Sequence, residues 1–309
     1  MGKIPLLVVA GPTASGKTVL GIKLAQKFGG EIISADSMQI YRGIPIATAQ
    51  PSEEELHAVP HHLIGFLELG TKFSVADYLP LAHEKAEEIS KRKKLPIVVG
   101  GTGLYIDSLS DDVKLNDCGS TEIRKELEEK LKANGAQYMH DMLCAVDEDS
   151  ARKIDVNNTR RVIRALEVFL STGVTITKHN ELSKKDGSRY NVCYLRLDFF
   201  NREHLYERIN RRVDIMMEQG LLEEAAAARP FVLENGAGQA IGHKEVYPYL
   251  DGEITKEQAL ENLKTATRRY AKRQQTWFSK RQNARSVFAD GGDVIAAAEN
   301  YIKDWMKTL

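Results

Sequence analysis

The sequence predicts an α/β fold in which helices flank a parallel β-sheet and a helical insertion interrupts the order of the strands. Short continuous apolar runs at 4–10, 31–35 and 95–99 each stop at a glycine or an aspartate, a pattern typical of buried parallel strands. Helical apolar spacing at 16–28 and 74–92 lies between these runs. Such alternation indicates a parallel sheet that binds ligands at the carboxyl ends of its strands.

The insertion is predicted from a change in character after about residue 113. The segments 121–133, 138–146 and 159–173 read as charged amphipathic helices with no clear strand between them. An alternating apolar pattern at 191–199 then resumes the sheet, and helices are expected at 202–219 and 256–281. We therefore predict a core of residues 1–113 and 191–309, with a helical insertion domain at 114–190.

Composition narrows the class of protein. Lysine plus arginine balances aspartate plus glutamate at 43 each, so net charge alone indicates no nucleic-acid partner. No apolar run is long enough to span a bilayer and no signal peptide is apparent, so a cytoplasmic protein with no membrane partner is expected. Cys118, Cys144 and Cys193 lie far apart and suggest neither a disulfide framework nor a zinc site.

The distribution of charge is more informative than its sum. Eight basic residues and no acidic one lie between Lys264 and Arg285, and Lys264, Arg268 and Lys272 follow helical spacing on one face. Interleaved aromatics such as Trp277 suit unstacked bases of a nucleic acid. A solvated basic helix with its aromatics in the core is the alternative.

The segment GPTASGKT lies between an apolar run and a helical stretch and has the spacing of a phosphate-binding loop, which makes the predicted sheet P-loop NTPase-like. Backbone N–H groups, the start of the following helix and a lysine would hold phosphates, and a threonine hydroxyl can reach Mg²⁺. The motif specifies a pyrophosphate-bearing ligand and leaves open whether it is ATP. The predicted pyrophosphate-binding residues are Gly11, Pro12, Thr13, Ala14, Ser15, Gly16, Lys17 and Thr18, with Thr18 as the metal ligand.

Two more strand ends carry polar groups next to this loop. Asp36 follows the second strand, where a carboxylate beside pyrophosphate would coordinate metal, take up a proton, or simply cap a helix. Thr102 follows the strand at 95–99 within Gly-Gly-Thr-Gly, and its hydroxyl could reach the same anion. In the insertion, Arg160, Arg161 and Arg164 sit together on a predicted helix and suit phosphate-backbone contact.

Together these motifs resemble the tRNA dimethylallyltransferase family. The resemblance runs through nearly the whole chain in family order, and the combination of SADSMQIYRG, GGTGLY and YAKRQ-x-TWF is highly specific. The segments that carry it are 11–18, 33–51, 59–66, 73–78, 96–106, 160–173 and 267–278. Without a Cys/His extension at its end, the chain is similar to bacterial members.

The resemblance implies transfer of a dimethylallyl group from dimethylallyl pyrophosphate to the exocyclic N6 amine of the adenosine just 3′ of the anticodon, in tRNAs that read codons beginning with U. Pyrophosphate leaves. By the same resemblance Asp36 is the base, while Lys17, Thr18, Thr102 and Arg212 stabilise the pyrophosphate together with Mg²⁺. The implied partners are the tRNA anticodon stem-loop and dimethylallyl pyrophosphate, and the chain is expected to be a monomer.

The resemblance also assigns tRNA contacts, which fall in five segments. One departure lies among them, because His243 stands where the family usually has tyrosine. An isopentenyltransferase for free adenine nucleotides and a P-loop kinase are the alternative functions. The predicted tRNA-binding residues are Asp36, Ser37, Met38, Gln39, Thr102, Arg160, Arg161, Val162, Ile163, Arg164, Gln239, Gly242, His243, Lys244, Lys272, Arg273, Gln274 and Trp277.

Overall fold

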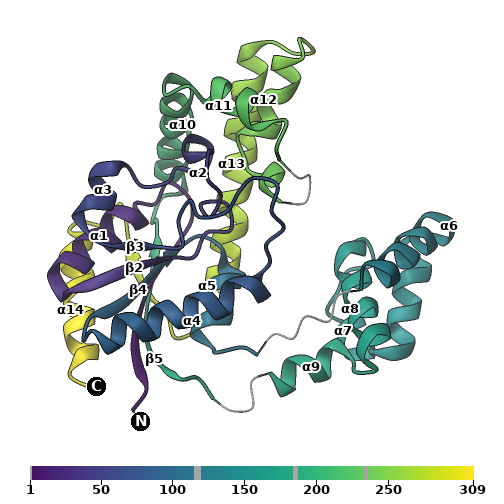
Figure 1. Ribbon diagram of the computed structural model, residues 1–309, viewed down its shortest axis with the longest axis horizontal. Coiled ribbons are helices and arrows are strands. Elements are labelled where there is room, and N and C mark those ends of the chain that lie inside the picture. The colour runs from purple at the N-terminus through teal and green to yellow at the C-terminus, as the bar shows by residue number, and fades with distance from the viewer. Residues whose placement is uncertain (1, 115–119, 184–186, 233–235) are drawn as a thin grey trace. The chain divides into compact units, whose positions relative to one another are not determined.

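The computed structural model describes residues 2–114, 120–183, 187–232 and 236–309 (Figure 1). The chain divides into a core unit, residues 1–110 and 189–309, and a helical unit, residues 111–188. The sequence predicted these junctions at 113/114 and 190/191, which is three and two residues later than the structure has them. Cys118 lies outside the described residues.

Within the described residues the core unit contains one sheet of six parallel strands, in the order β3-β2-β4-β1-β5-β6. Register places Val8 opposite Val98 on β4 and opposite Tyr194 on β5, so the strand after the insertion extends the sheet begun before it. The predicted α/β class with a parallel sheet is confirmed. The strands are β1 (Ile4–Ala10), β2 (Gly30–Ser34), β3 (His61–His62), β4 (Leu95–Gly100), β5 (Tyr190–Asp198) and β6 (Arg285–Phe288).

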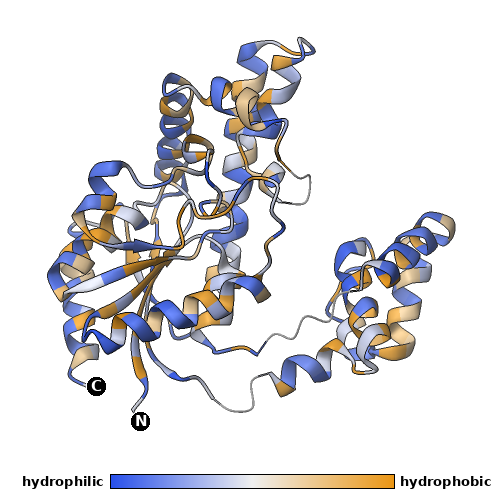
Figure 2. Ribbon diagram, in the orientation of Figure 1, coloured by the Kyte–Doolittle hydropathy of each residue, from blue (hydrophilic) through white to orange (hydrophobic). Residues whose placement is uncertain are grey.

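Helices cover both faces of the sheet. Alternate strand residues such as Leu7 and Ile97 pack with α1 (Lys17–Phe28) and α14 (Val294–Met306) in one apolar cluster. The opposite face is covered by α4 (Val75–Lys91) and α5 (Gly103–Ser110). Figure 2 shows apolar strands in the centre of this unit and hydrophilic residues on the outer faces of the helices.

Local sequence signals explain where α4 begins. Ser74 and Asp77 form a capping box, in which each side chain accepts a hydrogen bond from the other residue's backbone N–H. Such a box satisfies two donors that a helix start leaves unpaired. Pro80 therefore lies inside the helix rather than at its start.

The remaining core helices lie between β2 and β3 and between β5 and β6 in the chain. Of these helices, α13 ends three residues earlier than predicted. The sequence did not predict the short elements after residue 220, nor the strand β6 and the helix α14. The remaining core helices are α2 (Pro45–Thr48), α3 (Glu53–Ala58), α10 (Arg202–Glu218), α11 (Leu221–Ala228), the 3₁₀ helix η1 (Ala237–Gln239), α12 (His243–Leu250) and α13 (Lys256–Phe278).

The helical unit has its own apolar core. Leu127, Met139, Leu143, Val162 and Leu166 are buried together in it. Within α6, Gly135 departs from helical geometry at φ 81°, which divides the element into the two segments expected from the sequence. The helices are α6 (Thr121–Val146), α7 (Glu148–Ala151), α8 (Thr159–Thr172) and α9 (Ile176–Leu182).

Among the helices built from described residues, none combines the length and the apolar character that a bilayer crossing requires.

Candidate active site

A cavity of about 310 Å³ opens at the carboxyl edge of the sheet, next to the phosphate loop. The loop, the ends of β2 and β4, α2, the segment around η1, and one face each of α10 and α13 contribute to it. Its lining residues are Thr13, Lys17, Thr18, Asp36, Ser37, Met38, Gln39, Ala47, Thr48, Ala49, Val99, Gly100, Arg212, Val213, Met216, Gln239, Ala240, Ile241, Lys244, Thr267, Tyr270, Arg273 and Gln274.

The phosphate loop has the backbone that an anion cradle needs. Gly16 precedes α1 with φ 91°, a conformation that favours glycine, and no side chain caps the first N–H groups of that helix. Lys17 Nζ folds back to donate to the carbonyl oxygen of Pro12 at 2.7 Å. The buried Ser15 hydroxyl has no hydrogen-bond partner among the described residues. The loop therefore offers unpaired donors at the start of a helix, where anions bind.

Charges of both signs meet beside this loop. Burial lowers the pKa of Lys17 to about 7, with Asp36 opposing the shift and Arg212 adding to it. Burial likewise lowers the pKa of Arg212, again opposed by Asp36. Two cations therefore share one carboxylate in a partly desolvated site, and an added polyanion would relieve their mutual repulsion.

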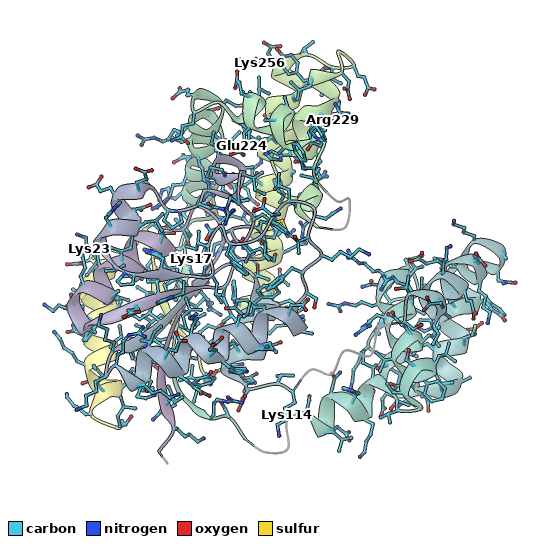
Figure 3. The ribbon with its side chains drawn as sticks, in the orientation of Figure 1. Lys17, Lys23, Lys114, Glu224, Arg229 and Lys256 are labelled. Carbon is cyan, nitrogen blue, oxygen red and sulfur yellow. The ribbon has the colours of Figure 1, made fainter. Side chains whose placement is uncertain are left out.

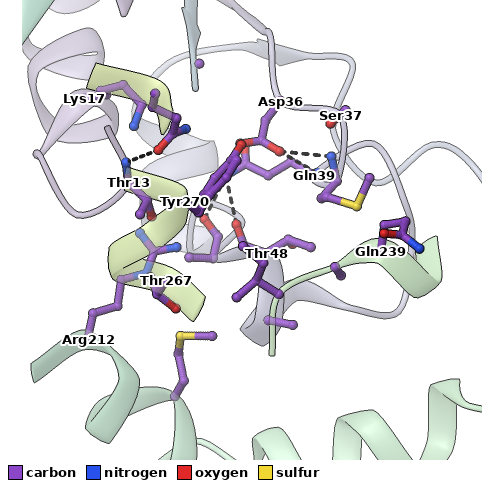
Figure 4. Close-up of a pocket in the computed structure, with 18 of the residues that line it drawn as sticks. Thr13, Lys17, Asp36, Ser37, Gln39, Thr48, Arg212, Gln239, Thr267 and Tyr270 are labelled. Carbon is purple, nitrogen blue, oxygen red and sulfur yellow. Dashed lines mark hydrogen bonds between the residues drawn. The ribbon is translucent and has the colours of Figure 1, made fainter. Parts of the chain in front are cut away.

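Asp36 follows β2 and faces the cavity. Its Oδ1 accepts backbone N–H groups of Met38 at 2.9 Å and Gln39 at 3.4 Å. Oδ2 accepts no hydrogen bond from the described residues, so one carboxylate oxygen is held while the other stays available. In the view of Figure 4, Lys17 and Arg212 lie toward one end of the cavity and Gln239 toward the other, with Asp36 and Tyr270 between.

Two of the predicted site residues are engaged within the protein. The Thr102 hydroxyl oxygen accepts the backbone N–H of Ser37 at 3.0 Å, and Thr102 is not among the residues that line the cavity. Gln274 is buried and bridges two loops, since it accepts the Thr13 N–H at 2.8 Å and donates to the Gly101 carbonyl at 2.9 Å. Both residues thereby hold the loops that shape the cavity.

Several lining residues were missed from the sequence. Val213 and Met216 on α10, with Ala47, Ala240 and Ile241, give the cavity an apolar portion next to its charged end. On α13, the polar lining residues Thr267 and Tyr270 were missed as well. Together with the predicted Gln274 they recur at spacings of three and four, which is the one sequence signal that could have found them.

The predicted tRNA-binding residues of the helical unit differ in how exposed their side chains are. Arg160 and Arg161 are exposed, whereas Val162 and Ile163 are buried in the apolar core and cannot present their side chains to a partner. Arg164 is paired with the buried carboxylate of Glu167 at 3.0 Å. The exposed cations of this segment are therefore Arg160 and Arg161.

The basic face predicted on α13 is partly used to hold α10. Lys264 pairs with Asp214 at 2.6 Å, and Arg268 pairs with Glu261 at 2.6 Å while donating to Asn210. Lys272 is exposed and forms no ion pair within the described part of the chain, and Arg273 is exposed at the cavity. The side chains of Lys272 and Arg273 are thus available to contact a binding partner.

The other predicted tRNA-binding residues of the core unit also differ in how exposed their side chains are. Lys244 and Gln239 line the cavity. His243 is fully buried, so its side chain does not reach the surface. Trp277 is about one-third exposed and donates its ring N–H to Asp107 at 2.6 Å.

The chain matches the family model described as IPP transferase over residues 39–282, which is most of its length. The chain belongs to the IPP transferase family. A second model, described as isopentenyl transferase, matches residues 4–64 of this chain and so covers the phosphate loop and Asp36. The family resemblance inferred from the sequence is confirmed, and the protein is a transferase.

Curated relatives match over nearly full length. A tRNA dimethylallyltransferase of Acetivibrio thermocellus is 46% identical and covers 97% of this chain and 95% of its own. The tRNA dimethylallyltransferase of Bacillus subtilis is 46% identical, with 89% and 88% covered.

Solved structures of relatives have the same fold as this chain. The tRNA isopentenylpyrophosphate transferase of Bacillus halodurans has a TM-score of 0.74 and 41% identity, and 99% of this chain and 98% of that chain are covered. A eukaryotic dimethylallyltransferase described as acting on tRNA has a TM-score of 0.82 and 30% identity, with 98% and 80% covered. The P-loop NTPase-like fold is thus shared with enzymes of the same family.

Proposed function

We propose that this chain transfers a dimethylallyl group from dimethylallyl pyrophosphate to the N6 amine of the adenosine just 3′ of the anticodon, in tRNAs that read codons beginning with U. The observation that carries the proposal is one cavity in which Lys17, Arg212 and Asp36 meet beside an apolar portion. Such a cavity suits a donor that joins a pyrophosphate to a short hydrocarbon.

The reaction needs a base and a stabilised leaving group. The bond between the donor carbon and the pyrophosphate oxygen breaks, and its electron pair leaves with the pyrophosphate, whose charge Lys17, Arg212 and the loop N–H groups would balance. The adenosine nitrogen forms the new bond to that carbon. The proton of that nitrogen would pass to Asp36 Oδ2, which accepts no hydrogen bond from a described residue.

Mg²⁺ fits the donors that are present. The Thr18 hydroxyl and the Asp36 carboxylate line one cavity. Mg²⁺ prefers oxygen ligands, and it usually keeps several water molecules and binds phosphate oxygens as well. Thr18 is the residue proposed to hold it. When bound, the ion would neutralise part of the charge on the pyrophosphate.

A tRNA is favoured over a free nucleotide as the acceptor. Exposed Arg160, Arg161, Lys272 and Arg273 offer cations in both units, which a small nucleotide does not need. An unpaired anticodon-loop base can leave its stack and enter a cavity of this kind. We further propose that the chain works in the cytoplasm, where tRNA is modified, and that it acts as a monomer.

The test is incubation of the purified protein with Mg²⁺, radiolabelled dimethylallyl pyrophosphate and an unmodified anticodon stem-loop. Label is expected at the adenosine that follows the anticodon. Label in AMP but not in the RNA would instead identify a free-nucleotide enzyme, and no label in either with turnover of ATP would identify a kinase.

The proposed base is tested in the same assay. Asp36→Ala should lower kcat by at least roughly 10²-fold, because no other carboxylate lines the cavity among the described residues. Affinity for the stem-loop should stay largely unchanged. Turnover at the wild-type rate would remove Asp36 as the base.

A further inference from the structure

Glu224 on α11 is a nearly buried carboxylate that does not itself line the cavity. It accepts three hydrogen bonds. Oε2 accepts the backbone N–H of Ile46 at 2.7 Å, and Oε1 accepts the backbone N–H of Ala47 at 2.9 Å. His243 Nε2 lies 2.9 Å from Oε1 and is the donor, because an ionised carboxylate only accepts.

Two of these bonds anchor α2. This four-residue helix has no side-chain cap of its own, and its first residue, Pro45, has no N–H to offer. Glu224 therefore serves as its cap from a distant element, where a carboxylate is favoured by the helix dipole. At the other end, Gln39 Nε2 donates to the Ala49 carbonyl at 2.9 Å. The segment is thus held at both ends.

The third bond joins α2 to a second wall of the same cavity. His243 is the first residue of α12 and lies two residues after the lining residue Ile241, which Ala240 precedes. Between them Gly242, at φ 127°, packs so closely on α2 that a Cβ there would lie 3.1 Å from Ala47 Cβ. Glu224 is the group that connects both walls. Figure 3 labels Glu224 above Lys17 in the core unit.

We propose that Glu224 is a positioning residue for the transfer reaction, acting through α2 and His243 on the walls formed by Ala47, Thr48, Ala49, Ala240 and Ile241. The inference rests on the proposed function, since these walls would enclose the acceptor base and the apolar part of the donor. A wall displaced by about 1 Å can lower turnover by roughly 10²-fold without any loss of a reacting group.

Glu224→Gln tests the proposal with little change in shape. The amide group presents N–H where one of the three donors now points, so at least one hydrogen bond is lost. We expect kcat/KM for the donor to fall by roughly 10- to 100-fold, while the Kd for the anticodon stem-loop stays within about twofold. Amide hydrogen exchange at Ile46 and Ala47 should become faster.

Glu223→Gln is the matched control, because Glu223 is the neighbouring exposed residue of the same helix. It should match the wild type in every measurement. Turnover by Glu224→Gln equal to that of Glu223→Gln would overturn the proposal, whether or not the exchange rates differ. Absence of label transfer by the wild type would instead refute the proposed function.

Two variants at His243 keep the proposal testable if Glu224→Gln does not fold. His243→Gln retains a side-chain N–H that can reach the carboxylate, whereas His243→Phe fills similar space without a donor. We expect a lower kcat for His243→Phe than for His243→Gln. Equal kcat values for the two would mean that the hydrogen bond to Glu224 has no positioning role.

Discussion

At the residue scale, Lys17 is an ammonium under competing influences. Burial and Arg212 both disfavour its charge, whereas Asp36 favours it, and the result is a pKa of about 7. The side chain is meanwhile held to the Pro12 carbonyl. A phosphate group in the loop would replace that carbonyl as the partner of the ammonium and favour its charged form.

This balance predicts a pH-dependent affinity for inorganic pyrophosphate. Below about pH 7 Lys17 is charged in the free protein. Above that pH Lys17 is mostly neutral, so it must take up a proton when pyrophosphate binds. The Kd should therefore rise through neutral pH, by up to about tenfold per pH unit. Calorimetric titration between pH 6 and 9 measures the dependence.

Lys17→Arg is the control, since a guanidinium stays charged throughout this range. Both proteins meet the same ionisation of the ligand, so the difference between their profiles isolates Lys17. Parallel profiles would show that Lys17 does not titrate in this range.

At the element scale, Glu31 connects elements at the amino end of the sheet. This buried residue of β2 is contacted by His62 on β3 at 2.8 Å, by Arg92 after α4 at 2.7 Å, and by Lys94 before β4 at 3.0 Å. Burial by itself would raise its pKa. The hydrogen bonds from His62, Lys94 and Arg92 outweigh burial and lower the pKa to about 2.

Glu31→Gln should therefore destabilise the core unit most at neutral pH. A carboxyl whose pKa is lower in the folded chain stabilises it above the unfolded pKa and loses that contribution as pH falls. A shift from 4.5 to about 2 corresponds to about 3 kcal/mol. Urea unfolding at pH 7 should show this difference, and it should narrow below pH 5.

Glu87→Gln provides the comparison, because the Glu87–Arg189 pair is exposed on both sides. Its effect on the free energy of unfolding should be below about 1 kcal/mol at every pH. A constant gap between wild type and Glu31→Gln from pH 7 to pH 4 would contradict the assigned pKa.

Elements also differ in how well the sequence predicts them. The strands β1 and β4 and the helices α1, α4 and α10 agree with the predicted ranges to within one residue, because each carries its own apolar periodicity and punctuation. The four residues of α2 carry no such signal. That helix depends on Glu224, 178 residues away in the chain, and only the tertiary fold brings the two together.

The same distinction applies to the candidate site. Lys17 and Asp36 stand next to strand ends in recognisable motifs, so the sequence places them. Val213 and Met216 line the cavity because α10 packs beside the loop, which no local pattern reports. Burial of Val162 and His243 likewise follows from packing, and a motif that includes a residue does not reveal whether its side chain is exposed.

At the scale of the whole molecule, a chain with no net charge must bind a polyanion through the placement of its cations. Many of those cations are already paired, as Lys264 is with Asp214 and Arg152 with Glu148. Lys272, Arg160 and Arg161 are exposed and form no ion pair with a described residue. The free cations, and not the total, should determine the affinity for tRNA.

Salt titrations of stem-loop binding test this placement. Each lysine or arginine that contacts a phosphate adds roughly one unit to the slope of log Kd against log salt. We expect Lys272→Ala to lower the slope by about one and Arg160→Ala with Arg161→Ala by up to about two. Lys264→Ala and Arg152→Ala should leave the slope unchanged, because those side chains are held by carboxylates. Equal slopes for Lys272→Ala and Lys264→Ala would mean that α13 does not contact the RNA backbone through its free cations.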